Sequence, residues 1–360
     1  STTVTFSHGS YVKTDGTVVD PILDTSGHVL DYDGPNLKPG EYLDPGPNLD
    51  NADLNHADLS HATIIQGSFV HANLSNAKLS DIDLDSSDMT HANLTNANLD
   101  NAHIDHVKLD NAILNGVWSG RAAGGGGNVL GYPASLPSGW MQRKGLLIGP
   151  NVDLSNTKLS GEDLSNANLS GVNVTNAEID GVTLSGIRSG GVTGTPASLP
   201  AHWQITSGYF LGPEVNLDSA DLTNVDLGHA DLTNAKLYDT VLTNTDLSNA
   251  TLTGVQSDNL TTVPAALPPD WQIKRFHLVG PGANLTNANL EGVLLTNSDL
   301  THTILTGANL SDVFLTDTNL TGANLSHANV ANTWFTNATL TGVQSGGIVE
   351  RPAALPTGWK

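Results

Sequence analysis

The chain has 360 residues, with 14% charged and 5% aromatic side chains, a formal net charge of −22 and no cysteine. The lack of cysteine excludes disulfides and thiolate metal sites, and the shortage of Lys and Arg disfavours binding to nucleic acid. No apolar run approaches the roughly 18–20 residues that cross a bilayer. The acidic charge leaves open a basic protein or a divalent cation as a partner, and is otherwise typical of a long, soluble surface.

Residues 1–40 lie outside the repeat that fills most of the chain, and they contain three short apolar stretches. These are Val4–Phe6, Tyr11–Val12 and Val18–Val19, which Gly and Asp separate. We expect short strands here that either cap the repeat or are donated to a neighbouring molecule. Because the chain starts at Ser1 and not at Met, we also expect an extracellular or cell-surface protein whose signal peptide has been removed.

Residues 41–116 form a first block in which an apolar residue, such as Leu54, Leu59 or Ile64, recurs at every fifth position. A small residue, usually Ala, stands two positions before most of them. A period of five fits neither a helix of about 3.6 residues per turn nor a strand of period two. If the chain turns a corner after every five residues, each Leu and each Ala points inward. The small Ala is needed because a narrow interior cannot hold two large side chains per side.

The same register returns in residues 151–186, 214–254 and 282–342. Its units include Ala92-Asn93-Leu94-Thr95-Asn96 and Ala308-Asn309-Leu310-Ser311-Asp312. These units resemble the pentapeptide-repeat family. The resemblance implies an all-β protein, a right-handed quadrilateral parallel β-helix (a pentapeptide-repeat solenoid) with Leu or Phe stacked in its core. Members of this family have no catalytic residues in common, so the resemblance implies no catalytic site.

Insertions separate the blocks at residues 117–150, 187–213 and 255–281. Each carries a Pro-Ala-x-Leu-Pro sequence followed by a tryptophan, namely Trp140, Trp203 or Trp271. Because Pro and Gly interrupt a strand ladder, we expect loops that leave the solenoid. A β-hairpin should follow each tryptophan, as at Gln204–Leu211. The tryptophans are either a stacking platform for a ligand such as a glycan or, as we favour, packing over the edge of a coil.

The two ends of the chain look like complementary halves of one insertion. Residues 343–360 repeat the first half and stop just after Trp359, whereas Gly40–Leu49 resembles the second half. We therefore predict that the protein binds itself head-to-tail, a contact that does not close and so builds a filament. The alternative is that the sequence was cut from a longer protein at the boundary of a module.

Histidine is frequent at outward positions of the first block: His56, His61, His71, His91 and His106. His71 and His91 should stack about 5 Å apart because they lie one coil apart. Such a pair can take a metal with the help of Asp, but Asn occupies the same positions elsewhere, at Asn76 and Asn96. We therefore favour ordinary polar surface residues and predict no metal site.

Threonine forms two outward rows in the last block: Thr296, Thr316 and Thr336, and Thr301, Thr321 and Thr341. Regular Thr arrays can suit ice or crystal surfaces. Here Glu291 and Ala331 interrupt them, and β-propensity explains them as well. The run Gly124–Gly127 is interpreted as a flexible tether.

We predict no catalytic residue, no cofactor and no enzyme activity, since the repeated carboxylates do not converge in one cleft. The predicted function is a structural or adhesive extracellular solenoid that assembles into filaments. One alternative, implied by the resemblance, is an acidic mimic of DNA that binds a type II topoisomerase. A second is a glycan- or ice-binding surface. We expect no nucleic acid partner and no membrane span.

Overall fold

This computed structural model describes residues 9–30, 36–120 and 128–359. The expected strand Val4–Phe6 and the expected tether Gly124–Gly127 lie outside the described residues. The chain divides into two compact units. Unit 1 comprises Ser1–Thr183 with Gly191–Leu199, and unit 2 comprises Leu184–Gly190 with Pro200–Lys360.

Strands are short, and the part of the chain that the structure describes contains no helix. It therefore holds no helix that could cross a membrane. The strands are β1 (Tyr11–Val12), β2 (Val18–Val19), β3 (Tyr42–Leu43), β4 (Thr63–Ile64), β5 (Met141–Arg143), β6 (Leu146–Ile148), β7 (Gln204–Thr206), β8 (Tyr209–Leu211), β9 (Lys236–Tyr238), β10 (Gln256–Asp258), β11 (Gln272–Lys274) and β12 (His277–Val279).

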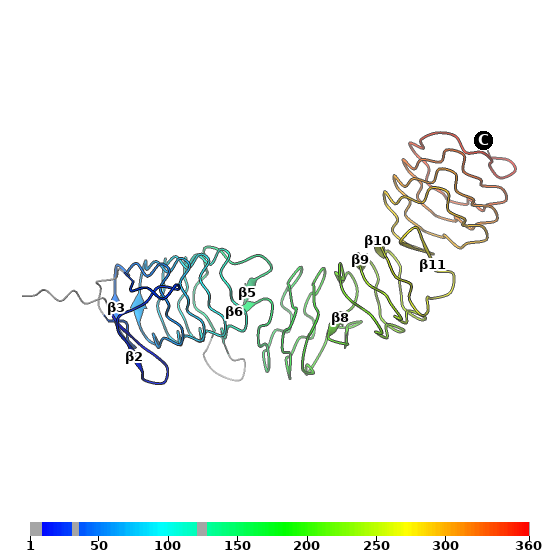
Figure 1. Ribbon diagram of the computed structural model, residues 1–360. Coiled ribbons are helices and arrows are strands. Elements are labelled where there is room, and N and C mark those ends of the chain that lie inside the picture. The colour runs from blue at the N-terminus through cyan, green and yellow to red at the C-terminus, as the bar shows by residue number, and fades with distance from the viewer. Residues whose placement is uncertain (1–8, 31–35, 121–127, 360) are drawn as a thin grey trace, which may run out of the picture. The chain divides into compact units, whose positions relative to one another are not determined.

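Most of the chain is a stack of coils in which a residue pairs in parallel with the residue 20 positions later. Asn73 pairs with Asn93 and Asn93 with Ile113, and the same offset recurs through both units. The Leu74 N–H donates to the carbonyl of Asn93 (2.7 Å), and the Asn93 N–H donates to that of Ala72 (2.9 Å). An offset of 20 means four five-residue sides per coil, so the right-handed quadrilateral parallel β-helix is confirmed. Figure 1 shows these coils as successive rungs.

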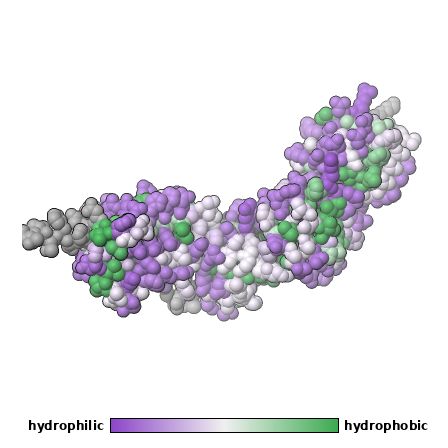
Figure 2. Space-filling model, in the orientation of Figure 1, coloured by the Kyte–Doolittle hydropathy of each residue, from purple (hydrophilic) through white to green (hydrophobic). Residues whose placement is uncertain are grey.

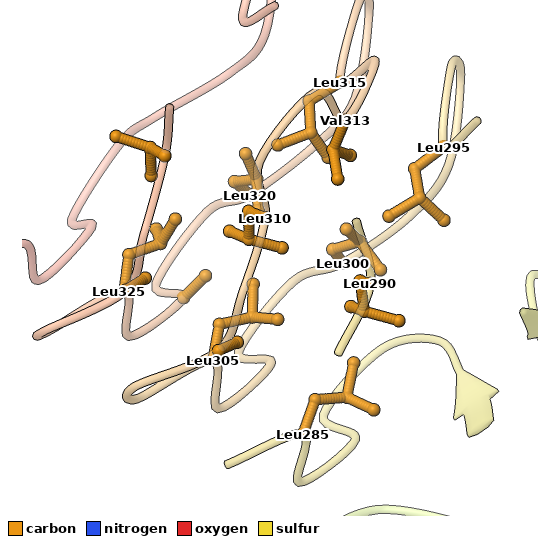
Figure 3. Close-up of a cluster of buried hydrophobic side chains, with 14 of the residues drawn as sticks. Leu285, Leu290, Leu295, Leu300, Leu305, Leu310, Val313, Leu315, Leu320 and Leu325 are labelled. Carbon is orange, nitrogen blue, oxygen red and sulfur yellow. The ribbon is translucent and has the colours of Figure 1, made fainter. Parts of the chain in front are cut away.

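The core is a row of leucines on each inner side, as the period of five predicts. In unit 2, Leu285, Leu305 and Leu325 follow one another on one side, and Leu290 and Leu310 lie on another (Figure 3). All are at most 2% exposed. Ala308 and Ala323 are fully buried between them. At about 25 cal/mol per Å² of apolar surface removed from water, this repeated burial is the main stabilising contribution.

Some of the small inward positions hold threonine in place of alanine. Thr318 and Thr333 are 1% and 0% exposed. Their hydroxyls donate to the carbonyls of Leu295 (2.6 Å) and Leu310 (2.7 Å) in the coil below. A buried hydroxyl is tolerated only with such a partner. Thr and Ala are therefore interchangeable at this position because a carbonyl lies within reach.

The insertions contain the expected hairpins, since β5–β6, β7–β8 and β11–β12 are antiparallel pairs. Their proline segments, however, do not leave the solenoid. Ser198 pairs in parallel with Glu178, and the Ala197 N–H donates to the Ala177 carbonyl (2.8 Å). Proline fits here because the following alanine supplies the N–H that the ladder requires. Each proline segment thus forms one more side of a coil.

The N-terminal residues cap the first coil of their own chain. Strands β1 and β2 form an antiparallel pair. Three backbone N–H groups of the first coil donate to backbone carbonyls of the preceding residues at 2.6–2.7 Å. The pairs are Asp53 with Leu23, Asp58 with Val12, and Thr63 with Glu41. Strand β3 pairs in parallel with β4 and does not form a hairpin like the other insertions. Of the two expectations for residues 1–40, the described part fits the cap.

Candidate functional site

The residue at the corner before each small residue has a left-handed backbone conformation. This conformation explains why histidine is frequent there. His71 and His91 both have φ of 60°, and Asn76 and Asn96 have φ of 57°. Asn, Asp and His enter this region several-fold more often than other non-glycine residues. Histidine at these corners is therefore accounted for by backbone geometry, without a ligand. The sequence carried this signal in the Asn and Gly that share the position.

The predicted stacking of His71 and His91 is confirmed, with ring centroids 4.7 Å apart and planes inclined by 28°. Among the residues that the structure describes, no carboxylate joins this pair in a group of three metal-capable side chains. Within the described ranges, the one group of three metal-capable side chains is Asp85, Asp105 and His106. That group shares the surface of the first block but not the column of His71.

The outward residue between Ala and Leu forms a second, polar ladder. In one column, the Asn93 amide donates to Asn73 (3.3 Å), and each of these side chains also accepts the N–H two residues on. The Thr223 N–H likewise donates to the Asp221 carboxylate (3.0 Å). Hydrogen bonds from the hydroxyl and the N–H of Thr223 hold the pKa of the Asp221 carboxyl below its ordinary value. These carboxylates and amides shape the turns of the coil.

Part of the second threonine row follows the same logic, whereas the residues two positions before Thr296, Thr316 and Thr336 are apolar and offer no side-chain acceptor. Thr321 lies on the outside, but its hydroxyl donates to Asn319 (2.7 Å), as Thr286 does to Asn284 (2.7 Å). The hydroxyl is therefore engaged within its own turn. This gives Ser and Thr a structural reason to follow each leucine, in addition to their β-propensity.

The tryptophans of the insertions pack against glycines of their own hairpins. A Cβ added to Gly212 would lie 2.7 Å from Cε3 of Trp203, and one added to Gly149 would lie 2.6 Å from Cε3 of Trp140. The indole thus lies flat on a glycine backbone that no other residue could provide. This arrangement supports packing over the coil edge, because one face of each indole is covered.

One exposed apolar row was not found by the sequence analysis. Leu294, Phe314 and Trp334 pair successively across three coils of unit 2 and are 62%, 41% and 43% exposed. The rings of Phe314 and Trp334 stack with centroids 6.2 Å apart. They occupy the outward position that Asn or Asp usually takes, which is the signal that was available. Figure 2 shows that such apolar residues lie in patches on a largely polar surface.

The last coil of unit 2 opens into an apolar cavity of about 680 Å³. Its lining includes Val330, Phe335, Leu340, Ile348, Leu355 and Trp359. Trp359 makes the same turn as Trp271, with its N–H donating to Pro356 (3.1 Å) as Trp271 does to Pro268 (3.2 Å). Trp271 packs against the buried core of unit 2, whereas Trp359 is 50% exposed.

Comparison with known proteins agrees with this architecture. The family described as pentapeptide repeats matches residues 46–81, 77–116, 151–186, 216–254, 282–317 and 304–342, which is more than half of the chain. The chain belongs to the pentapeptide-repeat family. No curated protein matches the sequence.

Solved structures that are similar to this pentapeptide-repeat chain include those of three different proteins. QnrB1, a plasmid-mediated fluoroquinolone resistance protein, is 20% identical over 61% of this chain and 85% of its own, with a TM-score of 0.20. HetL, which is involved in heterocyst differentiation regulation in the cyanobacterium Nostoc sp. strain PCC 7120, is 22% identical over 84% of this chain and 89% of its own, with a TM-score of 0.14. Rfr23 from the cyanobacterium Cyanothece 51142 is 20% identical over 54% of this chain and 87% of its own, with a TM-score of 0.10. At this level the similarities carry no argument about function.

Proposed function

We propose that this chain is a non-enzymatic, extracellular structural solenoid that associates through the largely apolar cavity lined by residues 325–359. The observation that carries the proposal is the cavity at residues 325–359. Leu355 and Trp359 are 37% and 50% exposed there, next to Phe335 at 5%. Exposed apolar surface at the end of a coil stack is stabilised by covering it.

The insertions of the same chain indicate what covers such an end. All three residues of β6 and all three residues of β12 are buried, so the second strand of each hairpin covers the core at those places. The cavity at residues 325–359 is lined by the same kinds of residue and offers room for an apolar segment. A second copy of the chain supplies that cover when two such ends meet around a two-fold axis.

The head-to-tail filament requires a different contact. Backbone N–H groups of the first coil already donate to the carbonyls of Val12, Leu23 and Glu41 of the same chain. An incoming end would have to displace the N-terminal cap or bind its outer surface. We therefore favour pairing of two C-terminal ends, and the head-to-tail filament is the other outcome of the same experiment.

Sedimentation velocity over a wide range of protein concentrations tests the proposal. We expect a monomer–dimer equilibrium that Leu355→Asp shifts to the monomer, because the association would bury a carboxylate in a largely apolar contact. Leu294→Asp is the control, since Leu294 is also an exposed leucine (62%, against 37% for Leu355) but lies on a side face where Asp is an ordinary residue.

A strictly monomeric wild-type chain at every concentration would rule the proposal out. Assemblies that keep growing beyond a dimer would favour the head-to-tail filament. Loss of association in Leu294→Asp, with Leu355→Asp unaffected, would move the contact to the exposed apolar row.

A second candidate function is binding to a type II topoisomerase, which the net charge of −22 favours. An acidic rod can occupy a groove that is lined with basic residues for DNA. A supercoiling assay with purified gyrase decides this candidate. Inhibition or protection at micromolar concentrations that salt abolishes would support it, whereas no effect would leave the structural solenoid as the better explanation.

A further inference from the structure

One face of the first block collects histidines and carboxylates from three successive coils. Thr63, Asp83 and His103 pair in a parallel column and set the register. Around that column, the same three coils present His61, Asp81, Asp85, Asp105 and His106. The segment from Asp81 to Asp85 alternates Asp with buried Ile82 and Leu84, so its three carboxylates all point outward.

The closest group on this face is formed by Asp85, Asp105 and His106. Nδ1 of His106 lies 3.5 Å from Oδ1 of Asp85 and 3.5 Å from Oδ2 of Asp105. One ligand atom from each of the three residues lies within 4.8 Å of the others. One imidazole nitrogen and two carboxylate oxygens at this spacing can reach a single ion after small side-chain rotations.

The backbone around this group is held on both sides. The Ser86 N–H donates to the Asp105 carbonyl (2.9 Å), which joins the two coils, and the His106 N–H donates to the Tyr132 carbonyl (2.9 Å). Gly131 has φ of 76°, and a Cβ there would lie 2.7 Å from Cβ of Asp105. Because Gly131 has no side chain, the backbone of the insertion can lie directly against Asp105.

The carboxylate of Asp105 is also oriented. The Tyr132 N–H donates to Oδ1 of Asp105 (3.1 Å) and leaves Oδ2 facing His106. A hydrogen bond that fixes the other oxygen of a ligating carboxylate is the arrangement that metal-binding carboxylates have in proteins. In Asp85, Oδ1 both accepts from the Ser86 hydroxyl (3.1 Å) and faces His106.

No lysine or arginine within the described residues forms an ion pair with Asp85 or Asp105. Other carboxylates of the block do have such partners, since Lys78 lies 3.5 Å from Asp58 and Lys108 lies 3.2 Å from Asp88. The negative charge beside His106 is therefore left for a cation, in a chain with a net charge of −22.

We propose that Asp85, Asp105 and His106 bind one divalent first-row transition-metal ion such as Zn²⁺, with solvent completing its coordination. Mixed imidazole and carboxylate ligands suit Zn²⁺ better than Ca²⁺, which prefers oxygen alone. The ion joins adjacent coils just before the first insertion and so stabilises the end of the block. The site differs from the sequence prediction, which named no metal ligand and considered His71 and His91.

Isothermal titration of the full chain with ZnCl₂, and separately with CaCl₂, tests the site. We expect one saturable Zn²⁺ site, with Ca²⁺ bound more weakly. His106→Asn should weaken Zn²⁺ binding by at least about 10-fold, as should Asp85→Asn. Asparagine keeps the left-handed corner, as Asn76 and Asn96 show, so the fold should be retained.

His91→Asn is the matched control, because His91 occupies the same kind of corner (φ of 60°) outside the group. It should bind Zn²⁺ like the wild type. As a second measurement, Zn²⁺ should raise the unfolding temperature of the wild type and of His91→Asn but not that of His106→Asn.

Three results would overturn the proposal. The first is the absence of saturable Zn²⁺ binding up to millimolar concentrations. The second is equal loss of binding in His91→Asn and His106→Asn. The third is Ca²⁺ binding as tightly as Zn²⁺ and independently of His106, which would show only an acidic surface that attracts cations.

Discussion

At the scale of single residues, the corner positions explain most of the repeat's outward composition. Asn, His, Asp and Gly alternate there because the backbone has φ near 60° at almost every corner. The Asn or Asp in the middle of each side and the Ser or Thr after each Leu complete the turn through short hydrogen bonds. The repeat therefore encodes a turn as much as a core.

Asn337 provides a test of this explanation, because it is exposed and has φ of 58°. Asn337→Val should lower the free energy of unfolding by about 1–2 kcal/mol, since a β-branched residue is strained in the left-handed region. Asn337→Gly should change it by much less, since glycine adopts this region freely. Denaturant unfolding measures both, and equal effects of the two variants would contradict the explanation.

At the scale of elements, each insertion is a side of a coil followed by a tryptophan and a hairpin. The proline segment stays in the ladder, and the indole lies on the glycine at the end of the hairpin. The hairpin carries its apolar strand, such as β8 with buried Phe210 and Leu211, into the core. The insertion therefore continues the solenoid while allowing a short antiparallel pair to project.

Gly212→Ala tests the contact between indole and glycine. The new methyl group would lie under 3 Å from Trp203, so the indole must move, at a cost of about 1–3 kcal/mol. The near-ultraviolet circular dichroism of the tryptophans should change as well. Gly346→Ala is the control, because a Cβ there meets no atom within 4 Å. Similar losses of stability in both variants would show that the contact does not matter.

At the scale of the whole molecule, the charge of −22 opposes any contact between copies. Two like-charged chains repel each other at low salt, and the repulsion is screened over about 10 Å at 0.1 M salt and about 3 Å at 1 M. Assembly of two copies through an apolar contact must overcome that repulsion. Binding to a basic partner is instead favoured by the attraction between opposite charges.

The dimer proposed above should therefore strengthen as salt is raised from about 0.05 M to about 0.5 M. Sedimentation velocity at a fixed protein concentration should show more dimer at the higher salt. Leu355→Asp should stay monomeric throughout, which serves as the control. Dissociation by added salt would instead indicate that attractive charge pairs hold the copies together.

The sequence by itself determined the coil, because a five-residue period with Leu and Ala inside has one simple solution in space. It also predicted the hairpins after Trp140, Trp203 and Trp271 and the stacking of His71 on His91, since these depend on local spacing and on the offset of 20.

Only the tertiary structure decided features that join residues from different coils. The buried hydroxyl of Thr318 depends on a carbonyl 23 residues away, and the proline segments depend on which N–H the ladder needs. The group at His106 depends on Asp85 one coil below and on Tyr132 beyond an insertion. A repeat predicts which column a residue occupies, but not how an insertion returns over that column, and that return orients the carboxylate of Asp105 beside His106.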